Sequence, residues 1–202
     1  MSEPAWRAVA ARAASLLLRY PDESVMAALP TLYDALTDLP RAVGDRLRPV
    51  ADHRRDTDPT ALAAEYVELF DFRRRCCLHL TYYTCGDTRK RGEALVGFTA
   101  AYKAAGLEVV GGELADYLPA VLDLAAVDDG GWRLLRNHRV ALHLVVTALD
   151  RSVYGNAAEA VRGMLPPARG ADLEAAADLA RTGPPTEQVG LEPYRLAGRP
   201  AS

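Results

Sequence analysis

The sequence predicts an all-α protein, a single-domain bundle of about eight helices. Half of its 202 residues are hydrophobic and a quarter are charged, which is typical of a globular domain long enough to bury a core. Between proline and glycine breakers the apolar residues recur every three or four positions, the spacing of a helix with one buried face. No segment shows the apolar–polar alternation of a half-buried strand.

The N-terminal half divides at prolines. The pair Tyr20-Pro21 ends an alanine- and leucine-rich first helix, and Asp58-Pro59 is a strong start signal, an N-cap carboxylate followed by proline at the first helical position. Apolar residues from Leu62 to Leu80 then continue at helical spacing until Cys85-Gly86. We therefore expect helices over 5–19, 22–36, 40–52 and 58–85.

The C-terminal half is punctuated by glycine. Gly106 is placed to end a helix that Asp87 or Thr88 begins, and the Asp-Asp-Gly-Gly run at 128–131 predicts a turn. We expect the later helices over 88–105, 117–127, 132–153, 157–165 and 171–181. Residues 1–182 then form one helical domain, and residues 183–202, poor in apolar side chains, a flexible tail.

The bulk composition excludes several classes of protein. A net charge of −3 and a pI near 5.8 argue against a nucleic-acid binder. No apolar run approaches the roughly 20 residues that a membrane span needs, and no signal peptide is evident at the start. Three cysteines, two of them adjacent, form a poor disulfide framework, so the sequence favours the reducing cytoplasm.

The segment YVELFDFRRRCCLHLTYYTCGDTRKRG, residues 66–92, is unlike a simple core or surface helix. It places Cys76, Cys77, His79 and Cys85 within ten residues, but no CxxC pair or second ligand cluster is present to complete a tetrahedral metal site. The chain also contains no catalytic motif such as GxSxG, HExxH or a P-loop. The sequence therefore predicts neither a bound metal or other cofactor nor an enzyme.

Two charged features indicate possible binding surfaces. Residues 71–92 hold six Lys or Arg against two Asp, which is either a solvated helix face or a docking patch for an acidic partner surface or an anionic cofactor. Glu113 and Asp116 lie between a glycine-rich link and Pro119. One interpretation is that Asp116 is the N-cap of the following helix. The other is that the carboxylates of Glu113 and Asp116, beside an aromatic stripe, form an acidic groove that binds a basic amphipathic peptide helix.

Three runs together resemble a known family. The segment 66–92, LLLRYPDE at 16–23 and ELADYLPAVLD at 113–123 are similar to the delta-subunit assembly chaperones of respiratory nitrate reductase, the NarJ type, within the TorD-like superfamily of redox-enzyme maturation chaperones. The resemblance extends from about residue 6 to residue 165 and is most specific in the first of the three runs.

The resemblance implies a cytoplasmic, TorD-like helical chaperone without catalytic activity. Its partner would be the catalytic (alpha) subunit of nitrate reductase, bound through the N-terminal leader-like segment during molybdenum cofactor insertion. The peptide-binding residues carried over are Tyr66, Phe70, Tyr82, Tyr83, Gly86, Asp87, Glu113, Asp116, Tyr117 and Pro119. Superfamily members often have histidine where Tyr117 stands, so a stacking or hydrogen-bonding role is expected there.

Further hypotheses stay open at this point. The basic run Arg89, Lys90 and Arg91 opens a helix, where cations oppose the helix dipole, so we expect carboxylate partners there. These are either Glu65 and Glu68 within the fold or a second, acidic contact on the catalytic subunit. Alternative functions are a chaperone for a different molybdoenzyme, or a helical regulator that responds to metal or redox state through its cysteines.

Overall fold

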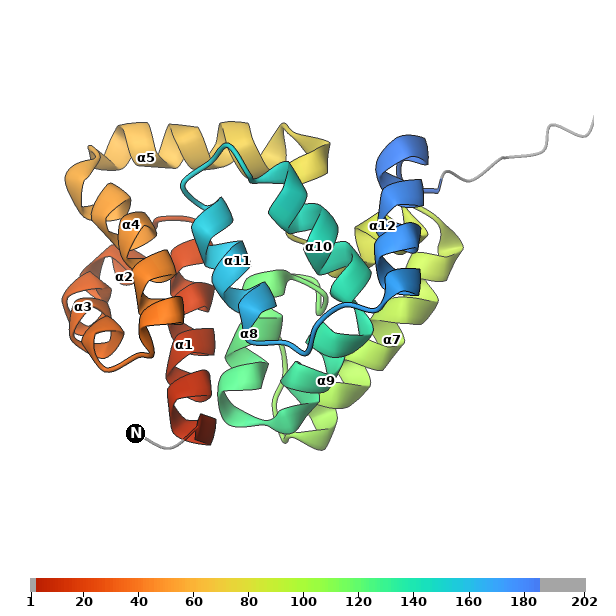
Figure 1. Ribbon diagram of the computed structural model, residues 1–202, viewed down its shortest axis with the longest axis horizontal. Helices are drawn as coiled ribbons and strands as arrows, with labels where there is room; N and C mark the ends of the chain where they lie inside the picture. Colours follow the sequence, from red (N-terminus) through yellow and green to blue (C-terminus); the bar gives the residue numbers. More distant parts are fainter. Residues whose placement is uncertain (1–2, 186–202) are drawn as a thin grey trace, which may run out of the picture.

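The structure, a computed structural model, describes residues 3–185, and this part of the chain is a bundle of α-helices without a β-strand (Figure 1). The all-α prediction is confirmed. No helix among these residues is long and apolar enough to cross a bilayer. Most of the tail expected over 183–202 lies outside the described residues. The helices are α1 Glu3–Leu18, α2 Glu23–Ala27, α3 Leu29–Thr37, α4 Arg41–Asp56, α5 Pro59–Tyr66, α6 Leu80–Cys85, α7 Arg89–Ala104, α8 Leu118–Val127, α9 Asp129–Asn137, α10 Arg139–Ala148, α11 Gly155–Gly163 and α12 Gly170–Thr182, with a π-helical turn η1 Val67–Asp71 and a 3₁₀ turn η2 Arg74–Cys76.

The centre of the bundle is the contact between α1 and α8, which lie side by side in Figure 1. Helix α1 also contacts α3, α4 and α11, and its small side chains Ala10 and Ala14 are fully buried. Polar contacts fix the register: the Ser15 hydroxyl donates to the Pro119 carbonyl oxygen at 2.8 Å, and Asp123 accepts from the guanidinium groups of both Arg12 and Arg19.

Two expected helices are each divided in two. The segment expected as one helix over 22–36 forms α2 and α3, and the one expected over 132–153 forms α9 and α10, which meet at His138. The turn expected at 128–131 is shorter than predicted. Asp128 ends α8 and also caps α9, accepting a hydrogen bond from the Gly130 backbone at 2.6 Å.

The continuous helix expected over 58–85 is the largest error in the sequence prediction. Its start is confirmed, because the Asp58 carboxylate accepts from the backbone of Thr60 and Ala61. The helix then widens into η1, leaves helical geometry at Arg73, and resumes only at α6. Residues 77–79 are extended because Leu78 and Leu80 hydrogen-bond to the backbone just before α8. A long-range pairing has replaced local helix formation.

Two glycines have distinct structural roles: one ends a helix, and the other allows two helices to pack closely. Gly106, with φ +71°, follows α7 as predicted, and the backbone N–H groups of Gly106 and Leu107 bond back to Lys103 and Tyr102, a Schellman motif. Gly131, in the first turn of α9, lies directly on α8. A Cβ at this position would lie 2.2 Å from the backbone nitrogen of Ala125.

We expect Gly131→Ala to destabilise the fold by about 2–3 kcal/mol, because the methyl group meets α8 backbone rather than a movable side chain. Gly97→Ala is the matched control. Gly97 lies within α7, and a methyl group added there would meet nothing within 4 Å, so alanine should stabilise by about 0.5–1 kcal/mol. Urea unfolding measures both values, and equal effects of the two changes would contradict the close packing of α8 and α9.

Candidate functional site

The first candidate site is a groove of about 440 Å³ beside α8, hereafter the acidic groove. It lies between the end of α1, the start of α2, the link 105–117 and the outer face of α8. Its lining residues are Arg19, Tyr20, Asp22, Tyr102, Leu107, Glu108, Val109, Val110, Glu113, Tyr117, Ala120, Asp123, Leu124 and Val127.

The acidic groove exposes an unusual amount of apolar surface. Tyr20, Leu107, Val110 and Val127 are among the few large hydrophobic residues that stay exposed in the described chain, and Val110 and Val127 are 76% and 71% accessible. Clustered apolar side chains with polar neighbours mark sites where another molecule binds. The groove therefore offers apolar surface that the fold itself leaves uncovered.

The rim carries a negative charge. Four carboxylates line the groove, those of Asp22, Glu108, Glu113 and Asp123, against the single cation Arg19. Asp123 is neutralised by its two arginine partners, whereas Glu108 and Glu113 form no ion pair with any residue between 3 and 185. An apolar floor beneath unpaired carboxylates favours a ligand that is amphipathic and basic.

Two tyrosines hold the floor in place. The hydroxyl groups of Tyr66 and Tyr117 lie 3.0 Å apart, and the Tyr66 hydroxyl donates to the Leu18 carbonyl oxygen, also at 3.0 Å. Burial raises the pKa of Tyr117 to about 12, so its hydroxyl stays protonated at neutral pH. The Phe70 ring packs against Tyr66 with centroids 4.5 Å apart. Tyr66 and Phe70 are thus buried supports, and only Tyr117 reaches the groove.

A buried cation lies behind these rings. The Arg54 side chain is fully buried, donates to the carbonyl oxygen of Arg19 at the end of α1, and lies 5.7 Å from the centre of the Tyr154 ring. Its Nε and Nη1 atoms have no hydrogen-bond partner among residues 3–185, and burial lowers the pKa of the guanidinium. Arg54 therefore joins α4 to the end of α1 and packs against Tyr154, a ring that also contacts Tyr66.

Asp116 is a buried anchor rather than part of the groove surface. One carboxylate oxygen accepts from the Thr81 backbone at 3.0 Å and from the Thr81 hydroxyl at 2.5 Å, and the other lies 3.1 Å from Nδ1 of His79. Backbone bonds from Leu80 to Asp116 and from Leu118 to Leu78 complete the contact, hereafter the Asp116 clip. The carboxylate therefore caps α6, and the sequence prediction that it caps the helix following it is wrong.

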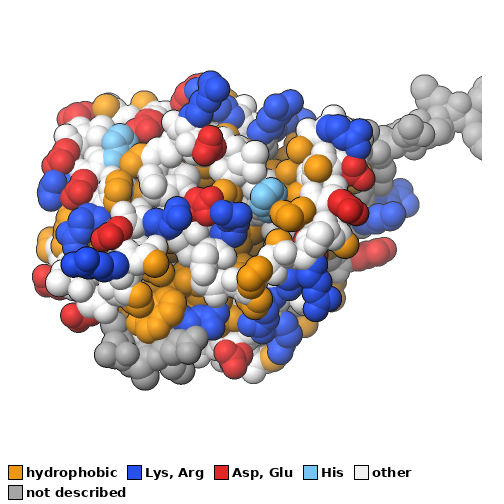
Figure 2. Space-filling model, viewed as in Figure 1, with side chains coloured by type: hydrophobic (Ala, Val, Ile, Leu, Met, Phe, Trp, Pro, Cys, Tyr) orange, Lys and Arg blue, Asp and Glu red, His pale blue; other side chains and the backbone are white. Residues whose placement is uncertain are grey.

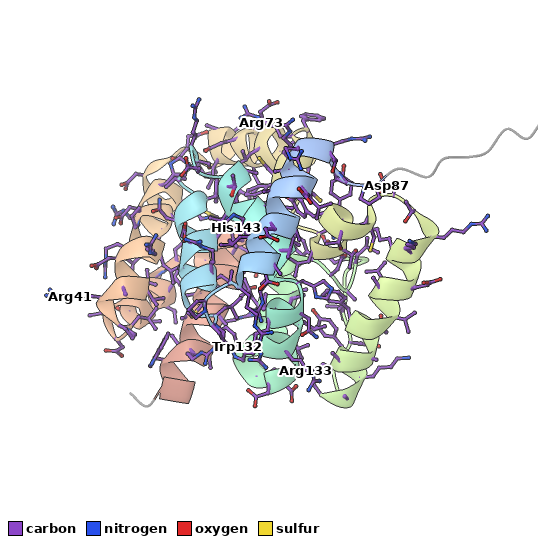
Figure 3. The ribbon with its side chains drawn as sticks, turned by 45° about the vertical axis from the view of Figure 1, so that its right-hand side comes forward. Arg41, Arg73, Asp87, Trp132, Arg133 and His143 are labelled. Atoms are coloured by element: carbon purple, nitrogen blue, oxygen red, sulfur yellow. The ribbon has the colours of Figure 1, made fainter. Side chains whose placement is uncertain are left out.

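The remaining predicted site residues lie elsewhere. Glu113 is exposed in the acidic groove, whereas Pro119 is buried beneath α1. The others gather around α6, where Tyr82 and Tyr83 line a second cavity, Gly86 is buried against Pro185, and Asp87 projects into solvent (Figure 3). The structure thus divides the predicted peptide site between two separate places.

The basic run at the start of α7 also differs from expectation. Arg91 is largely buried, pairs with Asp87 at 3.2 Å and lies 3.9 Å from the Asp116 carboxylate, while Arg89 and Lys90 are exposed. The carboxylates proposed as its partners within the fold are engaged with other residues. Glu65 pairs with His53 and Glu68 with Arg73.

The cysteines are free thiols in packed surroundings. The Cys76 thiol is buried and lies 3.7 Å from the Ala148 carbonyl oxygen, and burial raises the pKa of both Cys76 and Cys77. Among residues 3–185 no group of three or more His, Cys, Asp or Glu side chains is arranged to hold a metal ion. These observations indicate packing rather than reactivity.

Several groove residues escaped the sequence analysis. Tyr20 and Asp22 were interpreted only as a helix end and a helix start, and Glu108, Val110 and Asp123 were not singled out. The available signal was an apolar pair, Val109-Val110, inside a glycine-rich link where turn residues are normally polar. Arg54 gave no signal, because it stands in a run of charged residues.

The fold is shared with a class of solved structures. A putative redox enzyme maturation protein from Archaeoglobus fulgidus superimposes with a TM-score of 0.58 and 22% sequence identity, over 77% of this chain and 91% of that one. Residues 21–138 match a family model that is described as nitrate reductase delta subunit. The chain therefore belongs to the nitrate reductase delta subunit family.

Named relatives fall in the same family. The nitrate reductase-like protein NarX of Mycobacterium tuberculosis H37Rv is 36% identical over 149 residues, which is 73% of this chain and 22% of NarX. The nitrate reductase molybdenum cofactor assembly chaperone NarJ of Escherichia coli K12 is 34% identical over 119 residues, 55% of this chain and 49% of that protein. A probable NarJ of Bacillus subtilis is 33% identical over 59% of this chain and 66% of its own length. The chain thus spans about a fifth of NarX and between half and two thirds of the NarJ proteins.

We expect Asp116→Asn to cost about 3 kcal/mol at neutral pH, since it removes a buried charge from its hydrogen-bond partners. Burial raises the pKa of Asp116, but the hydrogen bonds from His79 and Thr81 outweigh it and hold the pKa below its usual value. A carboxyl group whose pKa is lower in the folded than in the unfolded protein stabilises the fold at pH values above its unfolded-state pKa, which is near 3.9. This stabilisation is lost as the pH falls through the folded-state pKa. The difference from the wild type should therefore be constant above about pH 5 and shrink below about pH 4.

Denaturant unfolding between pH 3 and 7 measures this difference. Glu113→Gln is the control, because Glu113 is exposed and unpaired within residues 3–185, and its effect should stay within about 0.5 kcal/mol at every pH. A difference for Asp116→Asn that grows in acid would show that the carboxylate is not held as described.

Proposed function

We propose that this chain is an assembly chaperone for respiratory nitrate reductase that works in the cytoplasm. It binds the N-terminal segment of the cofactor-free catalytic subunit and assists insertion of the molybdenum cofactor into that subunit. The observation that carries the proposal is the acidic groove, in which unpaired carboxylates surround exposed apolar side chains. The names of the NarJ relatives support the nitrate reductase system as the partner.

The geometry of the groove suits a helical peptide. An amphipathic helix would place its apolar face on Tyr20, Val110 and Val127 and direct basic side chains towards Glu108 and Glu113. The hydrogen-bonded pair Tyr66 and Tyr117 holds the floor before the ligand arrives, so little ordering is required on binding. Such a complex can reach about −8 kcal/mol, which corresponds to a Kd of roughly 1 μM.

The role proposed is binding, not bond chemistry. No serine or cysteine is among the groove residues, and the hydroxyl groups of Tyr117 and of Tyr66 behind it are engaged with each other and with backbone. The molybdenum cofactor is cargo for the catalytic subunit, and the chaperone itself requires no cofactor. A chaperone for another molybdoenzyme would use the same groove, so the peptide sequence that binds best decides between the two.

We expect a synthetic peptide from the N-terminus of the nitrate reductase catalytic subunit to bind with a Kd of about 1 μM or below. The double change Glu108→Gln and Glu113→Gln should weaken binding about three- to tenfold and reduce its salt dependence, because it removes exposed ion pairs. Isothermal titration calorimetry at two ionic strengths measures both effects.

The matched control is Glu93→Gln with Glu174→Gln, an equal change of charge on exposed positions of α7 and α12 away from the groove. Its peptide affinity should equal that of the wild type. Absence of binding heat at high peptide concentration would reject the nitrate reductase assignment. Tighter binding of a peptide from another molybdoenzyme would show that this chain is a chaperone for that enzyme instead.

A further inference from the structure

We propose that the second cavity, about 360 Å³ between η2, α6, α10 and the end of α12, is a docking site for an acidic segment with an apolar anchor. The segment belongs to the catalytic subunit but lies outside its N-terminal leader. The inference rests on the proposed function for the identity of the partner. We call this cavity the basic pocket.

The floor and walls of the basic pocket are apolar and aromatic. Leu144 and Ala148 of α10, Tyr83 of α6 and Leu179 of α12 contribute the apolar surface, and Tyr82 also lines the cavity. A cavity of this volume accepts one large apolar side chain together with its flanking backbone. Figure 2 shows apolar side chains between groups of Lys and Arg at the upper right of the molecule, where α12 ends.

The charge of the basic pocket is opposite to that of the acidic groove. Arg74, Arg75 and Arg181 line it, and no Asp or Glu is among the lining residues. Arg181 is paired with Asp178, and neighbouring Arg73 with Glu68, but Arg74 and Arg75 form no ion pair within residues 3–185. Two unpaired guanidinium groups beside an apolar cavity select a carboxylate-bearing ligand, whereas the basic leader would be repelled.

The two arginines stand on a fixed backbone. The Tyr83 hydroxyl lies 2.8 Å from the carbonyl oxygens of both Arg75 and Cys77 and donates its proton between them. Burial raises the pKa of Tyr83 well above its usual value, so this donor persists at any physiological pH. The irregular turn 73–77 is therefore held against α6, and the pocket rim exists before a partner binds.

The same turn exposes a further anchor for a protein partner. Phe72, which follows η1, is 73% accessible, and Arg73 lies close to the end of α12 at the top of the molecule (Figure 3). Arg and aromatic residues are the side chains most enriched at the centre of protein interfaces. Their concentration here favours a protein surface over a small anion as the occupant.

Both cavities can be occupied by one partner at the same time. They share no lining residue, so binding at one leaves the other open. Two linked weak contacts raise the effective concentration at each site and strengthen the complex well beyond either contact alone. The basic leader and an acidic second segment then hold the subunit at two points.

The test uses the full chain with two probes, the leader peptide and the cofactor-free catalytic subunit with its leader deleted. Arg74→Glu with Arg75→Glu should lower the affinity for the leader-deleted subunit at least tenfold and leave the peptide Kd within twofold. Arg46→Glu with Arg48→Glu, an equal charge change on exposed positions of α4, is the control and should alter neither affinity. Surface plasmon resonance measures the subunit, and calorimetry measures the peptide.

A second variant fills the cavity without changing charge. Thr147 is exposed and lines the basic pocket, so Thr147→Trp should lower subunit affinity at least tenfold at low and high salt alike, whereas Thr60→Trp on α5 should not. Melting temperatures close to that of the wild type confirm that the variants fold.

The outcomes separate the two proposals. If the wild type fails to bind the leader-deleted subunit, or if the basic-pocket and control variants behave alike, the second site is rejected. If the peptide alone fails to bind, the acidic groove is rejected instead. An affinity for the subunit that rises tenfold on deletion of residues 186–202 would identify the chain's own C-terminal segment as the occupant. Self-association that is lost in Arg74→Glu with Arg75→Glu would identify a second copy of the chain, and either result overturns the proposal.

Discussion

The buried carboxylate of Asp116 determines the course of two chain segments that the rest of the molecule depends on. An ionised group removed from water is tolerated only with several hydrogen bonds, and Thr81 and His79 provide them, while the Arg91 guanidinium adds a positive charge 3.9 Å away. On one side the clip turns the chain out of the helix that η1 would otherwise continue, which creates the irregular basic turn. On the other side it fixes Tyr117 and the end of the link that borders the acidic groove. Two surfaces of opposite charge therefore share one internal support.

The interior behind the acidic groove is organised for rigidity rather than for maximum apolar burial. Tyr66 contacts the rings of Tyr20, Phe70 and Tyr154, and its hydroxyl reaches both Tyr117 and the end of α1. Buried Arg54 lies against the same cluster with part of its hydrogen-bonding capacity unused. Leaving a buried donor unpaired costs stability, so this arrangement is easier to understand where a preformed binding floor is required. In the function proposed above, the bound segment would meet a surface that does not need to reorganise.

The sequence predicted what short-range chemistry controls. Asp58 before Pro59 began a helix, Gly106 ended one, and the resemblance placed the chain in the correct family. It could not predict contacts made by distant residues. Asp116 looked like the cap of the helix next to it, but its partner Thr81 lies 35 residues earlier in the chain. The helix expected through residue 85 failed for the same reason, because helical spacing continues through residues that pair elsewhere. The acidic loop was recognised at Glu113, while Tyr20 and Asp123 joined the same groove only through folding.

The contact between α1 and α8 has a consequence for the order of events during protein synthesis. Ser15 and Arg12 stand 104 and 111 positions before their partners Pro119 and Asp123, so the first helix leaves the ribosome long before its counterpart exists. At about 5–20 residues per second this interval lasts roughly 5–20 s. During that time α1 can pack against α3 and α4, but the face that contacts α8 has no permanent neighbour, and the groove, whose walls include both helices, cannot form. The groove can therefore form only after the chain has been synthesised through Val127, the last of its lining residues.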